Sequence, residues 1–317
     1  MSKRKPVEYD QMEVGEILGP VEVAIDTHFL RSAAFTVDDY HEWSLGDASP
    51  FGKPVAQGAA LLCDLLRLLY TRFDPNQDLG LHQHEEFQLF SPVFVGETVR
   101  LEGRFVEKYI KRGRGYIITE AEARTVGDDR LIIRHRATET ADLPGGQAHV
   151  DTKRDAPPSR RVVAQLPKGR TFVKDLSGAF AAGDPMRGPV KTIYQDQMSV
   201  YSGAHFFWES IHTNRDVAAK LGMKDTVAQG LMMVSYISEW ATRLFGKSWF
   251  QTGKVNATFL ASVFPGDVLS IFGIISETKQ SAEGTTVEVE FWVNTQNEEA
   301  AAVGWFSGLH SNDPMKS

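Results

Sequence analysis

Cysteine is nearly absent from this sequence, which contains only Cys63 among its 317 residues. A single cysteine excludes an intrachain disulfide framework and a zinc site built on cysteines. Long apolar runs are also absent, because no stretch approaches the roughly 20 residues that a membrane-spanning helix needs. The opening residues, MSKRKPVEYD, are basic but no apolar segment follows them. We therefore expect a cytoplasmic protein that is neither exported by a signal peptide nor inserted in a membrane.

The sequence also lacks an excess of positive charge. Its formal net charge is -7, which argues against nucleic acid as a partner. Hydrophobic residues make up 42% and charged residues 24%, as in ordinary globular proteins. A chain of this length is sufficient for two domains of about 150 residues, each with its own core.

An internal repeat supports two domains. The segment PVAQGAALLCDLLRLLYTRF (54–73) aligns with TVAQGLMMVSYISEWATRLF (226–245), and SPVFVGETVRLEG (91–103) aligns with ASVFPGDVLSIFG (261–273). The two matches occur in the same order in both halves, at nearly equal offsets of 172 and 170 residues. Two ordered matches indicate a duplicated domain, and two copies form a pseudo-dimer within one chain.

Each copy shows the same order of elements. After VAQG, about 18 mostly apolar residues predict a buried central helix, near 56–73 in the first copy and 228–245 in the second. Alternating apolar and polar residues then predict antiparallel strands, with turns at RGRG, GDD, AEG and QNEE. This is an α+β fold, a double hotdog in which two curved antiparallel sheets each wrap a central helix. We expect the two sheets to join side by side, with both helices on one side.

The stretch between the copies is rich in proline and glycine, as in LPGG, APPS and AAGDPMRGP. It predicts a long linker. The predicted domains are therefore an N-terminal hotdog domain at 1–141, a linker at 142–188 and a C-terminal hotdog domain at 189–317.

The second copy contains YSGAHFFWESIHTNRDVAAKLGMKDTVAQGLMM (201–233). This segment resembles the signature of the MaoC-like enoyl-CoA hydratase/dehydratase family, in which a Tyr-Ser-Gly turn precedes Ile-His-Thr and a glycine opens a helix. The resemblance implies that His212 is the catalytic histidine and that Tyr201, Ser202, Gly203 and Gly230 bind substrate. In the first copy, FTVDDYHEWSLGDASPFGKPVAQG (35–58) is a degenerate counterpart with Asp39 at the acidic position and Ser44 at the histidine position. The resemblance therefore predicts a silent first half.

The chain departs from the family pattern at one position. The family places Asp or Asn five residues before the histidine, and this chain has Phe207 there. Glu209 is the nearest carboxylate in the motif, so we predict that it pairs with His212. His205 and Asp39 are the alternatives.

Hydration of a double bond conjugated to a thioester needs a base for water, an acid for the α-carbon and a donor for the enolate oxygen. Histidine can exchange protons near neutral pH. Gly230 begins the predicted helix, where free N–H groups and the helix dipole favour an anionic oxygen. Its counterpart in the first copy is Gly58, for which a purely structural role is the alternative.

Other candidate residues fit structural roles better. The run LHQHEEF places His82, His84, Glu85 and Glu86 on a predicted strand, where alternation splits them between two faces and disfavours a metal site. Cys63 fits a buried helix residue. The run KYIKRGRGY fits a hairpin tip, with a CoA phosphate contact as its alternative.

These features predict a hydro-lyase that hydrates a 2-enoyl thioester or dehydrates a 3-hydroxyacyl thioester, with CoA as the expected carrier and no metal or other cofactor. A hotdog thioesterase and a noncatalytic acyl-thioester-binding protein are the alternatives. The expected partner is the small-molecule thioester, and the pseudo-dimer is also compatible with a homodimer.

Overall fold

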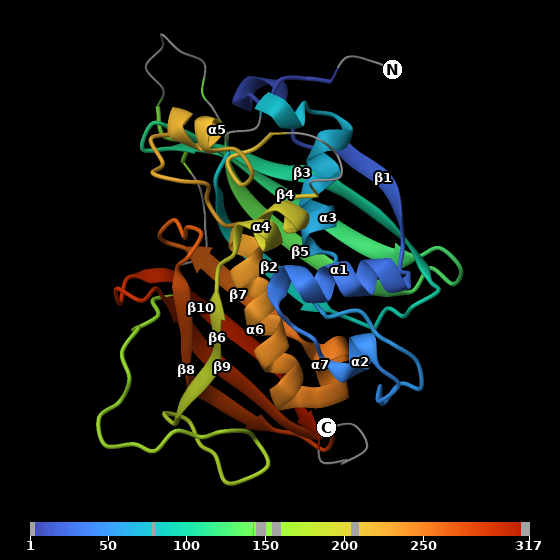
Figure 1. The fold of residues 1–317 in the computed structure, drawn as a ribbon, viewed down its shortest axis with the longest axis vertical. Coiled ribbons are helices and arrows are strands. Elements are labelled where there is room, and N and C mark those ends of the chain that lie inside the picture. Colours follow the sequence, from blue (N-terminus) through green and yellow to red (C-terminus); the bar gives the residue numbers. More distant parts are fainter. Residues whose placement is uncertain are drawn as a thin grey trace.

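The computed structural model describes residues 4–77, 80–141, 143, 150–153, 160–203 and 209–311 (Figure 1). The first half contains the strands β1 (Ile17–Ala24), β2 (His82–Leu89), β3 (Thr98–Lys111), β4 (Arg114–Thr125) and β5 (Leu131–Ala141). Its helices are α1 (Thr27–Val37), α2 (Glu42–Leu45) and α3 (Leu62–Leu66), with short 3₁₀ segments η1 (Tyr9–Gln11), η2 (Arg67–Thr71) and η3 (Pro75–Gln77).

The second half repeats this arrangement. Its strands are β6 (Pro185–Thr192), β7 (Lys254–Phe259), β8 (Val268–Gln280), β9 (Gly284–Asn294) and β10 (Ala300–Ser311). Its helices are α4 (Gln195–Tyr201), α5 (Arg215–Lys220), α6 (Gly230–Phe245) and α7 (Trp249–Thr252), and a 3₁₀ segment η5 (Gly246–Ser248) joins the last two. No helix in the described part of the chain has the length and apolar character needed to cross a bilayer.

All ten strands form one continuous antiparallel sheet in the order β1-β3-β4-β5-β2-β7-β10-β9-β8-β6. The two halves join where β2 pairs with β7. This pairing is symmetric about Glu86 and Asn256, which are 170 residues apart, the same offset as between the repeated segments 91–103 and 261–273. Figure 1 shows α3 and α6 on the same face of this sheet. The predicted double hotdog with joined sheets and helices on one side is therefore confirmed.

The two central helices differ from each other. Helix α6 covers Gly230–Phe245, close to its predicted range, and most of its side chains are buried because the sheet surrounds it. Gly246 ends it with φ 56, a left-handed value that favours glycine. In the first half, the predicted single helix is wrong, because only Leu62–Leu66 is α-helical and Arg67–Thr71 continues as a 3₁₀ turn.

The first helix starts later than predicted because of the contacts of the Gln57 side chain. The Gln57 side chain turns back and accepts a hydrogen bond from the Ala59 N–H at 3.0 Å. Its Nε2 donates to the carbonyl of Ser235 in α6 at 2.7 Å. A side chain that bonds its own backbone competes with helix formation, so residues 56–61 stay outside the helix, with 58–61 in turns.

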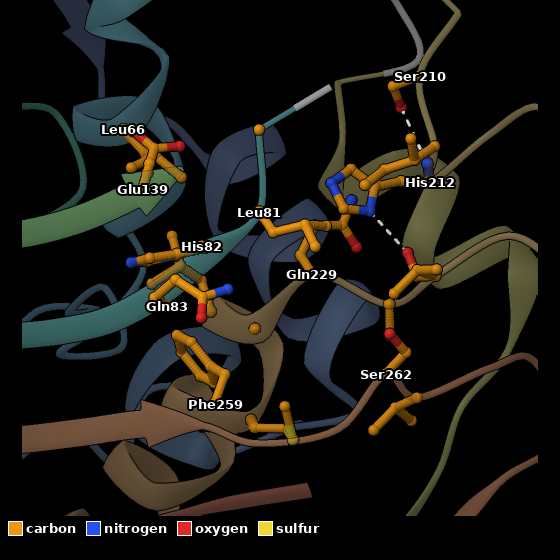
Figure 2. Close-up of a pocket in the computed structure, with 18 of the residues that line it drawn as sticks. Leu66, Leu81, His82, Gln83, Glu139, Ser210, His212, Gln229, Phe259 and Ser262 are labelled. Carbon is orange, nitrogen blue, oxygen red and sulfur yellow. Dashed lines mark hydrogen bonds between the residues drawn. The ribbon is translucent and has the colours of Figure 1, made fainter. Parts of the chain in front are cut away.

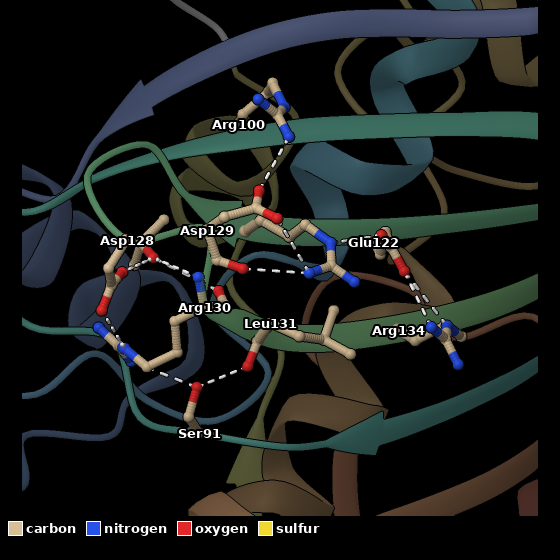
Figure 3. A network of polar contacts seen from close by, with 10 residues as sticks. Ser91, Arg100, Glu122, Asp128, Asp129, Arg130, Leu131 and Arg134 are labelled. Carbon is tan, nitrogen blue, oxygen red and sulfur yellow. Dashed lines mark hydrogen bonds and ion pairs between the residues drawn. The ribbon is translucent and has the colours of Figure 1, made fainter.

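The outer faces of the two halves differ in their ion pairs. On β4 and β5 of the first half, Glu122 pairs with Arg124 at 2.6 Å and with Arg134 at 3.0 Å, within a wider network of such pairs (Figure 3). In the second half, Arg160 from the segment before β6 reaches Glu288 at 2.6 Å and Glu290 at 2.7 Å on β9. The first face therefore carries ion pairs between its own strands, whereas Arg160 of the predicted linker pairs with the second. The predicted domain bounds stay a prediction.

The predicted hairpin tip is confirmed. Strands β3 and β4 are joined through Arg112 and Gly113, both with positive φ (51 and 70), which matches the two-residue turns favoured in hairpins.

Candidate active site

A cavity of about 310 Å³ lies between the two halves (Figure 2). The first half contributes residues of α3 and η2, the start of β2 and the facing ends of β4 and β5. The second half contributes the segment before α6, the first turns of α6, and the end of β7 with the loop that follows. Its lining includes Cys63, Tyr70, His82, Arg114, Glu139, His212, Gln229, Gly230 and Phe259. A ligand held here would contact both halves.

His212 lies in the wall of this cavity, half-buried, and its tautomer is fixed. The imidazole Nδ1 lies 2.6 Å from the backbone carbonyl of Val227 (Figure 2). A carbonyl can only accept, so Nδ1 carries the proton and Nε2 of the neutral ring has a free lone pair. Burial lowers the pKa of His212 to about 4, with a further lowering by the positive charge of Arg67 and an opposing effect of the Val227 bond. The ring is therefore neutral at physiological pH and can act as a base.

The backbone around His212 is held by several hydrogen bonds. Gln195, the first residue of α4, donates from Nε2 to the His212 carbonyl at 3.0 Å. The Thr226 hydroxyl donates to Gln195 Oε1, and the His212 N–H donates to Ser210 Oγ at 3.2 Å. A base held in this way needs little reorganisation on binding substrate.

Gly230 lies at the first position of α6 and also lines the cavity. The preceding Gln229 gives no side-chain cap, since its Nε2 donates to the Met198 carbonyl at 3.1 Å and to the Ser202 hydroxyl. The first N–H groups of a helix have no partner within it, and the helix dipole favours an anion there. An ideal Cβ on Gly230 would lie 2.8 Å from the ring of Phe259, so packing also requires glycine here.

The Tyr-Ser-Gly turn lies behind the cavity. Tyr201 ends α4, Ser202 bonds the Gln229 side chain, and Gly203 has φ 70. None of these three belongs to the described lining of the cavity. Their predicted substrate contact stays a prediction.

Of the predicted partners of His212, Glu209 and Asp39 belong to the described residues, and neither is part of the described cavity wall. Glu209 is exposed and is not part of the described cavity wall. His205 and Phe207 fall outside the described residues. Asp39 is buried in the first half, next to Lys191, Gln57 and Glu239, and burial raises the pKa of its carboxyl. The pairing of Glu209 with His212 stays a prediction without support from the geometry.

The equivalence of Ser44 and His212 can be followed in the backbone. The Val55 N–H donates to the carbonyl of Trp43 at 2.9 Å, and the Val227 N–H donates to the carbonyl of Ile211 at 3.0 Å. Val55 and Val227 both belong to VAQG, so the residues after Trp43 and Ile211 occupy matching positions. The first half thus has a hydroxyl where the second half has an imidazole.

Gly58, the counterpart of Gly230 in the first half, is packed against a tryptophan of the second half. An ideal Cβ on Gly58 would lie 2.9 Å from Trp249 Nε1, 2.9 Å from Leu89 and 3.0 Å from the Ser238 hydroxyl. Trp249, at the start of α7, is fully buried and donates to Ser238 Oγ at 3.1 Å. Gly58 is therefore packed against the Trp249 indole and Leu89, whereas Gly230 is packed against the Phe259 ring.

Sequence reasoning missed the contribution of the first half to the cavity. His82 lines the wall and packs edge-on against Phe259, with ring centroids 5.0 Å apart. Glu85, fully buried, lies 3.2 Å from His82 Nε2 and 3.0 Å from His135 Nδ1, and these imidazoles lower the pKa of its carboxyl against the effect of burial. A register shift between His82 and His84 turns His82 inward, which simple alternation in LHQHEEF does not predict.

The described residues contain no group of His, Cys, Asp and Glu arranged to hold a metal ion. Cys63 lies in α3 as predicted, with its thiol on the cavity wall. Burial raises the pKa of this thiol to about 11, which disfavours a thiolate nucleophile.

Comparison with known proteins agrees with this geometry. Residues 179–297 match the family described as the MaoC like domain. No curated protein sequence matches the chain. A structure from Chloroflexus aurantiacus titled as a putative MaoC domain protein dehydratase has 10% identity and a TM-score of 0.72, covering 99% of both chains.

Two further structures resemble the whole chain. A Mycobacterium tuberculosis protein described as having a double hotdog fold has 15% identity and a TM-score of 0.67, covering 96% of this chain and 98% of its own. The peroxisomal multifunctional enzyme type 2 of Drosophila melanogaster has 15% identity and a TM-score of 0.61, covering 93% of this chain and 48% of the larger protein. Identities this low establish the fold alone. The chain thus has the double hotdog fold, and its second half is similar to the MaoC like domain over residues 179–297.

Proposed function

We propose that this protein is a hydro-lyase that reversibly hydrates a 2-enoyl thioester to a 3-hydroxyacyl thioester, with CoA as the expected carrier. The observation that carries the proposal is the position of His212. Its Nδ1–H donates a hydrogen bond to the Val227 carbonyl, and its neutral ring lines the same cavity as Gly230, the first residue of α6. The match to the MaoC like domain supports the same reaction class.

The chemistry follows from these two groups. His212 Nε2 accepts a proton from water as the water oxygen bonds to the β-carbon of the enoyl group. The electron pair of the double bond moves toward the thioester, and the enolate oxygen accepts a hydrogen bond from the Gly230 N–H. The imidazolium then returns its proton to the α-carbon. One residue can therefore serve as base and acid in turn, which suits a chain with Phe207 at the usual acidic position.

The test is a panel of enoyl- and 3-hydroxyacyl-CoA esters, followed by mass spectrometry for gain or loss of water. We expect His212→Ala to lower kcat by about 10²-fold or more, the usual scale for positioned acid–base catalysis. Ser44→Ala is the matched control, because Ser44 holds the equivalent position in the first half. We expect this variant to keep most of the activity. Glu209→Gln distinguishes the mechanism with His212 alone from the predicted Glu209–His212 pair. A large loss of kcat in this variant would support the pair.

Two outcomes would reject the proposal. Release of free thiol without a water adduct would identify a thioesterase, which uses the same groove and helix terminus but directs water to the carbonyl carbon. Tight binding of esters without any turnover would identify a binding protein.

A further inference from the structure

The end of helix α4 is held by the first half of the chain. The carbonyl of Tyr201 accepts a hydrogen bond from the Arg67 guanidinium and another from the Cys63 thiol at 3.3 Å. The last carbonyls of a helix lack partners within it, and a cation at that end interacts favourably with the helix dipole. Arg67 therefore caps a helix of the other half.

Helix α4 connects this cap to the catalytic candidate. Its last residue, Tyr201, bonds Arg67, and its first residue, Gln195, bonds the His212 carbonyl at 3.0 Å. A third contact holds the same helix, because Gln197 Nε2 donates to the carbonyl of Phe35 in α1 at 2.8 Å. The seven-residue helix is thus a short rigid link between the first half and His212.

Arg67 also acts on His212 through its charge. Its side chain is only 16% exposed, so water screens the charge weakly, and Asp64 at 3.3 Å is its acidic partner. The guanidinium favours the neutral form of the imidazole, in the same direction as burial. The ionisable groups that share the described cavity wall with His212 are Cys63, Tyr70, His82, Arg114 and Glu139, and Arg67 lies outside this lining.

We propose that Arg67 is a positioning residue for His212, which caps α4 across the boundary between the halves and keeps a positive charge beside the imidazole. This inference rests on the proposed function for its kinetic consequence only. The first half of the chain therefore acts on the site in the second half, through a contact that a separate C-terminal domain would lack.

The direct test is an NMR titration of the His212 imidazole in the full chain, with the signal assigned by its loss in His212→Ala. In Arg67→Met we expect the pKa of His212 to rise by ~0.5 unit or more, since a nearby cation is removed. Arg72→Met is the matched control. Arg72 is an arginine of the same half that also donates to a backbone carbonyl, that of Ile17 at 3.1 Å, but within its own half.

Arg67→Lys separates the two roles. It keeps the charge, so the pKa of His212 should stay near its original value, but an ammonium does not reproduce the guanidinium bond to Tyr201. We expect kcat on the active ester to fall about tenfold or more in both Arg67 variants, because displaced catalytic groups lose rate steeply. The acid limb of the pH profile should move upward only in Arg67→Met.

The outcomes distinguish this inference from the proposed function. A folded Arg67→Met protein with an unchanged His212 titration overturns the electrostatic role, and unchanged kcat in both variants overturns the positioning role. A shifted titration in a protein that hydrates no ester supports the effect of Arg67 on His212 and rejects the proposed function.

Discussion

Replacing His212 tests how strongly the fold holds this side chain in its neutral form. The pKa of His212 is lowered from 6.5 to about 4 in the folded protein, mainly by burial. Between these values the unfolded chain binds a proton that the folded chain does not, so stability must fall as the pH falls. At about 1.4 kcal/mol per pKa unit, this one group costs about 2 kcal/mol at pH 5 and about 3 kcal/mol at pH 4, relative to pH 8.

The assay is urea unfolding of the wild type and of His212→Gln at pH 8 and pH 5. Other histidines and carboxyls titrate in both proteins, so the difference between the two isolates His212. We expect the wild type to lose about 2 kcal/mol more than the variant between these pH values, on the linkage just given. Equal losses in the two proteins would show that the His212 pKa is not depressed, and the argument for a neutral base would fail.

Two further predictions concern the glycine positions of the two halves. Gly230→Ala should lose about 1–3 kcal/mol in urea unfolding, because the new Cβ meets the Phe259 ring. Gly178→Ala, with open space around its Cβ, should lose almost none, and equal losses would contradict the packing argument. Trp249→Ala should lose about 3–5 kcal/mol and open a cavity beside Gly58 that a crystal structure would show, whereas a loss below 1 kcal/mol would mean that the indole does not fill that space.

Much of the fold can be predicted from the repeat and the periodicity. The shared VAQG segments and the alternating strands indicate two similar halves, and the matched backbone bonds of Val55 and Val227 show that the alignment is correct in detail. Helix α6 is predicted nearly to the residue, because its apolar character and its place in the core agree.

The late start of the first helix could not be predicted in the same way. Its apolar sequence favours a full helix, but Gln57 bonds its own backbone and the carbonyl of Ser235. Trp249, far away in the sequence, packs against Gly58. Contacts of this kind depend on how the halves pack, which neither half reveals alone.

The sequence predicts the residues that the second half contributes to the candidate site, but not those from the first half. The position of His212 and of Gly230 on one cavity wall follows the motif. The contributions of His82 and Arg67 do not, since one depends on a register shift in β2 and the other on a bond to the end of α4. Both come from the first half, which has Ser44 at the position equivalent to His212.

The central claim is that water adds to the β-carbon of an enoyl thioester at the His212 cavity. It is tested most directly by incubating the protein with a 2-enoyl-CoA ester in water enriched in heavy oxygen, then locating the label by fragment mass spectrometry. We predict label in the 3-hydroxyl group of an intact thioester, with none in the His212→Ala reaction over the same time. Label in a free carboxylate, together with released thiol, would contradict the claim.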